Sequence, residues 1–384
     1  MATDLISATS TPYSDAGPQN WSDLPNGLLH SILLRLYHTR DLLAFSSVCR
    51  SWRSFATSTM ATFRTSLFPP LLTFFDVKYR RRRRRRPFPS SLRLHDPTTE
   101  TFNQSPVEES ILSKPFLCCS HGHLLFLTRR RQILVVNIIT GFQITSPVLP
   151  LDHHPGSSYS CLAQLTASVS SQNCTLIFLT VDKLFLWKIN SPDWFYRPLR
   201  VHLTKLRQMI VVGSRIVVVG RNVWAFEFWN MLSIKEFPLY LCPKELVVQC
   251  PTQNILSSFE ISQFVDCDGE ILYVCFTPSN ESSELGRQFK NEVFHVDILD
   301  DHMILVNKNN LGNQALFLSM AVNDPGCVCN NPERWGAKNN FIYYAKDDRC
   351  YRFEVGGFVP HCTIYDVSQV KRFNSFWHYA SILQ

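Results

Sequence analysis

The sequence has almost no excess of charge outside one short run, and this excludes a broadly basic protein. The formal net charge of +7 equals the number of arginines in the single run 80–86. A fold that binds duplex nucleic acid normally spreads Lys and Arg over a whole face or helix. We therefore expect no nucleic-acid partner for the body of the chain.

Secretion signals and long apolar runs are also lacking. Residues 1–20 have neither the basic start nor the apolar core of a signal peptide, and they predict a flexible tail. The most apolar window, 208–220, is short and contains Arg215, so we expect no membrane-spanning helix. The 13 cysteines are odd in number and form no CxxC pair. Together these features predict a protein of a reducing compartment, the nucleus and/or cytoplasm.

Motifs for catalysis and metal binding are missing as well. The sequence contains no GxxxxGK[ST], HExxH or GxSxG motif. His121 and His123 lie two residues apart but have no further pair at ligand spacing, and Cys327 and Cys329 lie in a segment whose Asn, Pro and Gly content predicts a surface loop. We predict no enzyme activity, no cofactor and no metal site.

A helical pattern begins at Trp21. Apolar residues recur every three or four positions, first through Leu24, Leu28, Ile32 and Leu36, and then through Leu42, Phe45, Cys49, Trp52 and Ala56. Some forty residues cannot bury all this surface internally. The pattern leaves two alternatives open: a partner groove covers these residues, or they pack on the next domain.

The same stretch resembles the F-box, a three-helix module that docks on the Skp adaptor of cullin-based ubiquitin ligases. The resemblance rests on Leu24-Pro25, on Asp41-Leu42 and on the run from Val48 to Arg53, and it covers residues 21–60. It implies that Skp, and through it cullin, are partners. By this resemblance the adaptor contact is lined by Leu24, Pro25, Leu28, Ile32, Val48, Cys49 and Trp52.

From about residue 65 to 375 the pattern is that of short strands. Six pairs of runs rich in Val, Ile, Leu and aromatic residues each predict a hairpin: 71–75 with 91–96, 124–127 with 132–137, 175–179 with 184–189, 215–219 with 223–228, 270–274 with 293–298, and 341–344 with 350–355. Repeated small antiparallel sheets indicate a propeller. The predicted fold is mainly β, with a small helical N-terminal domain followed by a β-propeller of about six degenerate blades. Glycine is scarce, so five blades or a sandwich stay open as alternatives.

The C-terminal end resembles a plant domain of unknown function that often follows an F-box and is grouped with kelch-like repeats. This resemblance rests on "LGNQALFLS" at 311–319 and "NNFIYYAKDD" at 339–348. Together with the F-box resemblance, it implies a substrate receptor of a Skp-cullin-F-box ubiquitin ligase, which recruits a target protein for ubiquitination and degradation. Loops at one end of a propeller commonly bind the partner, and Trp335 in the 321–338 segment is a candidate aromatic anchor.

The arginine run lies between two predicted strands, where a hairpin loop would solvate its charge. An import signal and a contact with phosphate or an acidic partner are the alternatives. A non-degradative protein- or RNA-binding module that uses this loop is the rival to the ligase hypothesis. The run consists of Arg80, Arg81, Arg82, Arg83, Arg84, Arg85 and Arg86.

Overall fold

The computed structural model describes most of the chain. The described residues are 20–36, 39–67, 70–78, 88–96, 101–151, 161–204, 206–220, 223–230, 233–241, 262–283, 286–299, 302–319, 323–346, 349–357, 363–366 and 372–378. The predicted N-terminal tail and the arginine run 80–86 lie outside these residues.

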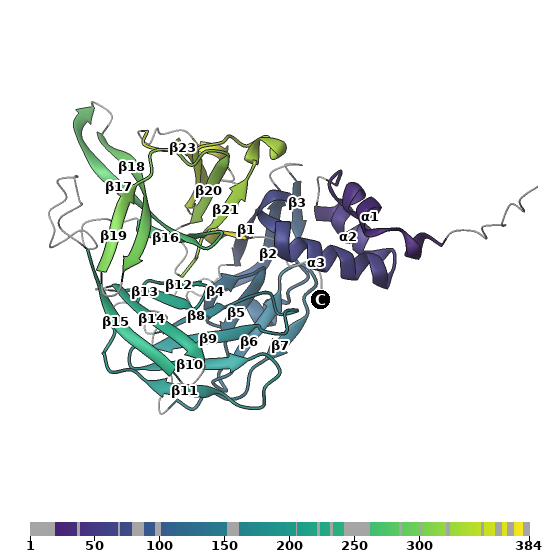
Figure 1. Ribbon diagram of the computed structural model, residues 1–384, viewed down its shortest axis with the longest axis horizontal. Helices are drawn as coiled ribbons and strands as arrows, with labels where there is room; N and C mark the ends of the chain where they lie inside the picture. Colours follow the sequence, from purple (N-terminus) through teal and green to yellow (C-terminus); the bar gives the residue numbers. More distant parts are fainter. Residues whose placement is uncertain are drawn as a thin grey trace, which may run out of the picture.

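The N-terminal part is a small helical domain that projects from one side of the molecule (Figure 1). It contains η1 (Trp21–Asp23), α1 (Asn26–Leu33), α2 (Thr39–Ser47) and α3 (Arg50–Leu67). Pro25 precedes α1, and its carbonyl accepts the first helical hydrogen bonds, from the N–H groups of Leu28 and Leu29. Helix α3 continues past the predicted end at residue 60 and leads directly to the first strand.

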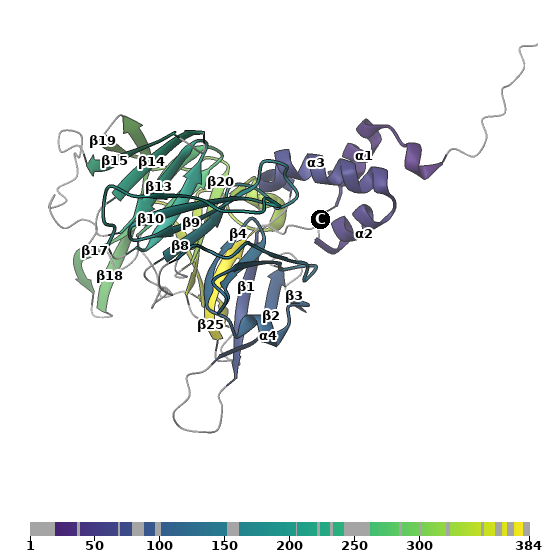
Figure 2. The same ribbon diagram turned by 90° about the horizontal axis from the view of Figure 1, so that it is seen from below.

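The rest of the described chain forms a six-blade β-propeller, seen from two directions in Figures 1 and 2, so the predicted fold class is confirmed. Blade 1 has the order β25-β1-β2-β3 and blades 2 and 3 are the sheets β4-β5-β6-β7 and β8-β9-β10-β11. Their strands are β25 (Arg372–His378), β1 (Leu71–Lys78), β2 (Phe88–Asp96), β3 (Thr101–Gln104), β4 (Phe116–Ser120), β5 (His123–Leu127), β6 (Ile133–Asn137), β7 (Gln143–Thr145), β8 (Cys161–Leu165), β9 (Thr175–Thr180), β10 (Lys183–Lys188) and β11 (Phe195–Pro198). A short helix, α4 (Glu109–Leu112), lies between β3 and β4.

Blades 4 and 5 are joined in one sheet by a short parallel pairing between β15 and β19, and blade 6 has the order β21-β20-β22-β23-β24. Their strands are β12 (Gln208–Val212), β13 (Arg215–Val219), β14 (Val223–Asn230), β15 (Ser233–Leu241), β16 (Ser262–Cys267), β17 (Glu270–Ser283), β18 (Gly286–Leu299), β19 (His302–Asn307), β20 (Gln314–Ser319), β21 (Cys327–Asn330), β22 (Phe341–Lys346), β23 (Arg349–Glu354) and β24 (Thr363–Asp366). The 3-10 helix η3 (Pro332–Trp335) follows β21.

Each predicted hairpin is the central antiparallel pair of one blade. The pairs are β1–β2, β5–β6, β9–β10, β13–β14, β17–β18 and β22–β23. Six apolar clusters fill the spaces between neighbouring blades, one at each junction around the ring. A sheet with both faces covered needs apolar side chains on both faces, which explains the continuous apolar runs that the sequence shows.

The ring is closed by a strand from the far end of the chain. Strand β25 pairs antiparallel with β1, so that Leu71 lies opposite His378 and Asp76 opposite Arg372. The buried Trp377 packs its ring 4.8 Å from that of Phe317 in blade 6. Closure therefore joins three segments that are far apart in the sequence.

Blade 6 departs from the simple up-and-down order. After β20 the chain turns inward to β21, and then passes to the other side of β20, where β22 runs parallel to it. The prediction of a surface loop at Cys327–Cys329 is therefore wrong. Val328 and Cys329 are buried in a strand, because only the flanks of this segment carry the turn-forming residues.

Two side chains hold a turn in blade 2. The Asn137 side chain accepts hydrogen bonds from the N–H groups of Ile139 and Thr140, each at 2.9 Å, and the Thr140 hydroxyl accepts one from the Phe142 N–H. This ties the turn that leaves β6, as such side chains commonly do. Within the described part of the chain, no helix is both long enough and apolar enough to cross a bilayer.

Candidate protein-binding interface

The helical domain has a small core of its own. Leu29 and Leu33 of α1, Leu42 and Phe45 of α2, and Ala56 of α3 are buried together. Leu71, at the start of β1, belongs to the same cluster, so this core continues into the first blade. Some of the apolar residues at helical spacing are thus packed within the protein, and others are left for other contacts.

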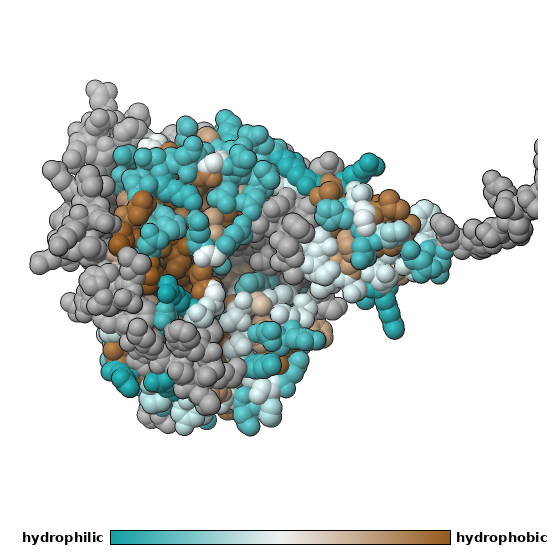
Figure 3. All heavy atoms as spheres, in the orientation of Figure 1, coloured by the Kyte–Doolittle hydropathy of each residue, from teal (hydrophilic) through white to brown (hydrophobic). Residues whose placement is uncertain are grey.

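Four large apolar side chains of this domain stay exposed to solvent. We call Trp21, Leu28, Leu34 and Val48, which are 71%, 53%, 40% and 52% exposed, the exposed apolar set. Apolar residues gather on the face of the helical domain that Figure 3 shows. Exposed apolar residues at helical spacing are typical of a surface that receives a partner.

The seven residues predicted to line the adaptor contact fall into three groups. Three are exposed (Pro25, Leu28 and Val48), three are half-buried (Leu24, Ile32 and Cys49), and one is buried (Trp52). Their participation in an adaptor contact stays a prediction. Trp21 and Leu34 were not among them, although a Trp placed just before Leu24-Pro25 was a visible signal.

Trp52 is a core residue of the helical domain. Its side chain is 8% exposed, its ring centroid lies 4.7 Å from that of Phe45, and its Nε1–H donates a 2.9 Å hydrogen bond to the Trp21 carbonyl. The indole thereby ties η1 to α3. The structure gives Trp52 a role in holding Trp21 and α3 in place.

Asn323 and Asp324, which precede β21, lie at the centre of the propeller. The Asn323 side chain accepts a 2.9 Å hydrogen bond from the Met209 N–H of β12 and donates one to the Ala163 carbonyl of β8. The Asp324 carbonyl accepts hydrogen bonds from the side chains of Gln208 in β12 and Gln263 in β16. Asn323 and Asp324 are each 3% exposed, so this segment links the innermost strands of several blades.

The Asp324 carboxylate is buried at this centre. Burial raises the pKa of Asp324 to about 7, while hydrogen bonds from the Ser319 hydroxyl and from the N–H groups of Gly326 and Trp377 oppose the rise. Burial also raises the pKa values of the nearby Cys118 and Cys161 thiols, which therefore stay protonated and unreactive at neutral pH. The described centre is a packed polar network.

Trp335 does not lie exposed in a loop, as its candidacy for a target anchor requires. It ends η3, it is 8% exposed, and it belongs to the apolar cluster between blades 6 and 1. The guanidinium of the neighbouring Arg334 stacks 5.0 Å from its ring centroid and donates a hydrogen bond to the Leu34 carbonyl at the end of α1. A role for Trp335 in target binding stays a prediction, and its burial favours a structural role between blades 6 and 1 instead.

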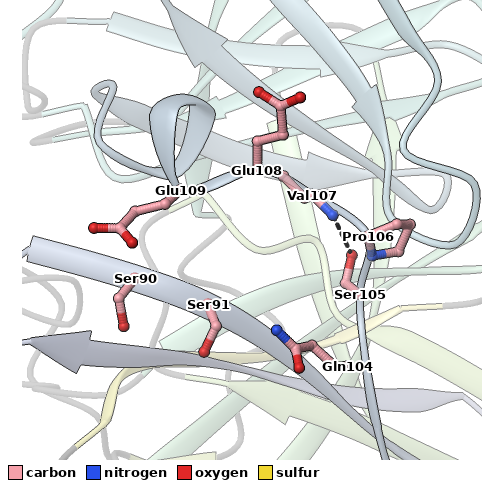
Figure 4. Close-up of a pocket in the computed structure, with 8 residues that line it drawn as sticks. All are labelled: Ser90, Ser91, Gln104, Ser105, Pro106, Val107, Glu108 and Glu109. Carbon is pink, nitrogen blue, oxygen red and sulfur yellow. Dashed lines mark hydrogen bonds between the residues drawn. The ribbon is translucent and has the colours of Figure 1, made fainter.

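The surface hollows of the described propeller include the following two. The first, of about 680 Å³, lies on blade 1 (Figure 4). Ser90 and Ser91 of β2 line one side, and Glu109 of α4 and Gln104 lie near them, while the Glu108 side chain points away from the serines. The second hollow, of about 560 Å³, lies between the turns that begin blades 4 and 5.

Known protein families match both parts of this architecture. The KIB1-4 β-propeller matches residues 91–366. The chain belongs to the KIB1-4 β-propeller family. An F-box-like domain matches residues 21–67, so the resemblances found in the sequence are confirmed in both halves. Among the described residues of this KIB1-4 β-propeller, no group of three or more His, Cys, Asp and Glu side chains is arranged to hold a metal ion.

Individual relatives are similar over limited stretches. An F-box protein of Arabidopsis thaliana, At2g17690, is 46% identical over 55 residues, which is 14% of this chain and 13% of that protein. A candidate 6-phosphogluconolactonase of Bacteroides fragilis has a TM-score of 0.38 at 9% identity, over 80% of this chain and 98% of that one. The N-terminal domain of Nup159 has a TM-score of 0.29 at 13% identity, over 57% of this chain and 56% of that one. These structural scores are too low to carry an argument about function.

Proposed function

We propose that this protein is the substrate-recognition subunit of a Skp-cullin-F-box ubiquitin ligase. One observation carries the proposal: an F-box-like domain keeps large apolar side chains exposed while it is attached to a propeller that is free to hold a second protein. In this proposal the exposed apolar set faces the Skp adaptor, and the blades face the target. The expected location is the nucleus and/or cytoplasm.

The chain would contribute proximity and no chemistry of its own. Holding a target lysine beside an activated ubiquitin, ready for transfer, raises the effective concentration of the two reacting groups. Such a role needs a defined geometry between the two domains. Helix α3 contacts β21, and Arg334 bonds to the Leu34 carbonyl, so two separate contacts support this geometry.

Co-purification with a plant Skp adaptor and a cullin tests the proposal. We expect the parent chain to retain both, and a Leu28→Glu/Val48→Glu variant to lose about 100-fold in adaptor affinity, because two carboxylates would be placed in a contact that excludes water. Both positions are exposed, so the variant should fold normally. Val306→Glu in β19, where an exposed apolar residue is also replaced, is the matched control.

The outcomes are distinct. If the parent chain captures no adaptor, the ligase hypothesis fails and the exposed apolar set serves another contact. If the parent and the Leu28→Glu/Val48→Glu variant capture the adaptor equally, the chain is a receptor, but the contact lies on a different surface. The rival hypothesis of a non-degradative module rests on the arginine run, outside the described residues.

A further inference from the structure

The hollow between blades 4 and 5 is a groove of a size suited to a peptide side chain or two. Its volume is about 560 Å³, within the range of pockets that hold small ligands. The β12–β13 turn at Gly213 and Ser214 and the β16–β17 turn at Gly269 border it. It is separate from the helical domain and from the packed centre at Asp324.

Apolar side chains contribute to the lining of this groove. Val212 is half-buried, and Ile271, Val296 and Ile298 are 6%, 5% and 9% exposed. These side chains form an apolar floor, while Ser214, Glu270 and Asp297 are among the residues that make the rest of the lining polar, so the groove suits an apolar side chain with a polar or charged neighbour.

On the blade 4 side of the groove, the positive charge of Arg215 is paired with the carboxylate of Glu227. The Arg215 Nε lies 2.7 Å from Glu227 Oε1, and its guanidinium also donates to the Ile298 carbonyl at 3.4 Å. This ion pair leaves no excess of either charge on that wall. The hydrogen bond from Arg215 to the Ile298 carbonyl also connects the end of β18 with blade 4.

On the blade 5 side, negative charge is in excess. Glu270 and Asp297, with side chains 54% and 49% exposed, flank His295, whose ring nitrogens lie 3.8 Å and 3.3 Å from their carboxylates. Extending the β17–β18 register by one residue from Ile271–Val296 places Glu270 opposite Asp297. Like charges opposite each other in a sheet repel. Lys308 lies 3.4 Å from Glu270 and offsets one of the two charges.

We propose that this groove binds an extended segment of the target protein in which an arginine or lysine stands next to an apolar side chain. The cation would bind at the exposed edges of the Glu270 and Asp297 carboxylates, beside His295, and relieve their repulsion, and the apolar neighbour would contact the floor near Ile271 and Val296. Arginine should be preferred, because its planar guanidinium bonds to a carboxylate through two parallel hydrogen bonds. This inference rests on the proposed function, since it names the class of target for the same receptor.

Selection from a randomised library of 12-residue peptides, with the full chain bound to the Skp adaptor, tests the inference. We expect the retained peptides to carry Arg or Lys next to Leu, Ile, Val or Phe. Binding of the best peptide should fall about tenfold or more in a Glu270→Gln/Asp297→Asn variant, and it should weaken with rising salt. The matched control is Glu108→Gln/Glu109→Gln, which removes two exposed carboxylates from blade 1.

Three results would overturn the inference: no peptide is retained, the retained peptides lack basic residues, or the Glu270→Gln/Asp297→Asn variant binds them as the parent does. Adaptor capture is measured in the same samples. If the parent chain captures the adaptor but binds no peptide, the groove proposal fails and the receptor function still stands. If the parent chain does not capture the adaptor, the receptor function itself fails.

Discussion

Replacing Trp52 with alanine is expected to unfold the helical domain while leaving the propeller intact. The change removes a large buried ring packed on Phe45, together with the indole hydrogen bond to the Trp21 carbonyl. Truncation of a buried aromatic residue costs about 3–5 kcal/mol, which is a large share of the stability of a small domain. Hydrogen exchange, read separately in α1–α3 and in the blades, measures the effect.

Two comparisons separate this loss of stability from a lost contact. In Trp52→Phe most of the packing is kept, so a smaller loss of protection is expected. Excess adaptor should restore capture by Trp52→Ala, because binding stabilises the folded state by mass action, but it should restore much less with Leu28→Glu/Val48→Glu. Unchanged exchange in α1–α3 of the Trp52→Ala variant would show that Trp52 is a contact residue after all.

The stability of the propeller is expected to fall as pH rises from 4 to 7, because of Asp324. Its carboxyl has an ordinary pKa of 3.8 when unfolded and a pKa of about 7 when buried in the native protein. Between these values the folded state holds a proton that the unfolded state releases, so folding is favoured at the acidic end and this contribution is lost as pH rises through 7. With 1.36 kcal/mol for each pKa unit, the difference is about 2–4 kcal/mol.

An Asp324→Asn variant isolates this contribution, since its amide is similar in shape and does not ionise. The free energy of unfolding of the variant minus that of the parent should increase by about 2–4 kcal/mol between pH 4 and pH 8. Groups other than Asp324, including the buried thiols Cys118 and Cys119, cancel in this difference. Asp193→Asn, at an exposed position, is the control and should show no trend. A constant difference for Asp324→Asn would mean that its carboxylate is ionised throughout.

Most predictions based on local patterns agreed with the structure, although the surface loop expected at Cys327–Cys329 is a buried strand. All six hairpins were recognisable, because each is formed by two apolar runs that follow one another in the sequence. The start of α1 after Pro25 and the turn held by Asn137 were likewise set by a few adjacent residues. Blade 6 was only partly predictable, since the order β21-β20-β22 depends on which strand reaches the centre.

Burial was less predictable than secondary structure. Leu28 and Trp52 occupy positions of the same kind in the helical pattern, yet one is 53% exposed and the other 8%. Periodicity identifies an apolar face but does not say whether the chain itself or a partner covers it. The same limit explains why Trp335 was expected on the surface, although it packs between blades 6 and 1.

The sequence by itself determined the two-part organisation, the helical pattern of residues 21–60 and the six hairpins, because these depend on short-range spacing of apolar and turn-forming residues. Tertiary structure decided the closure of the ring by β25, the filling of its centre by Asn323 and Asp324, and the groove beside Glu270 and Asp297. These features bring together residues from distant parts of the chain. Local sequence patterns do not predict such contacts, because the free energy that stabilises these contacts comes from packing between whole blades.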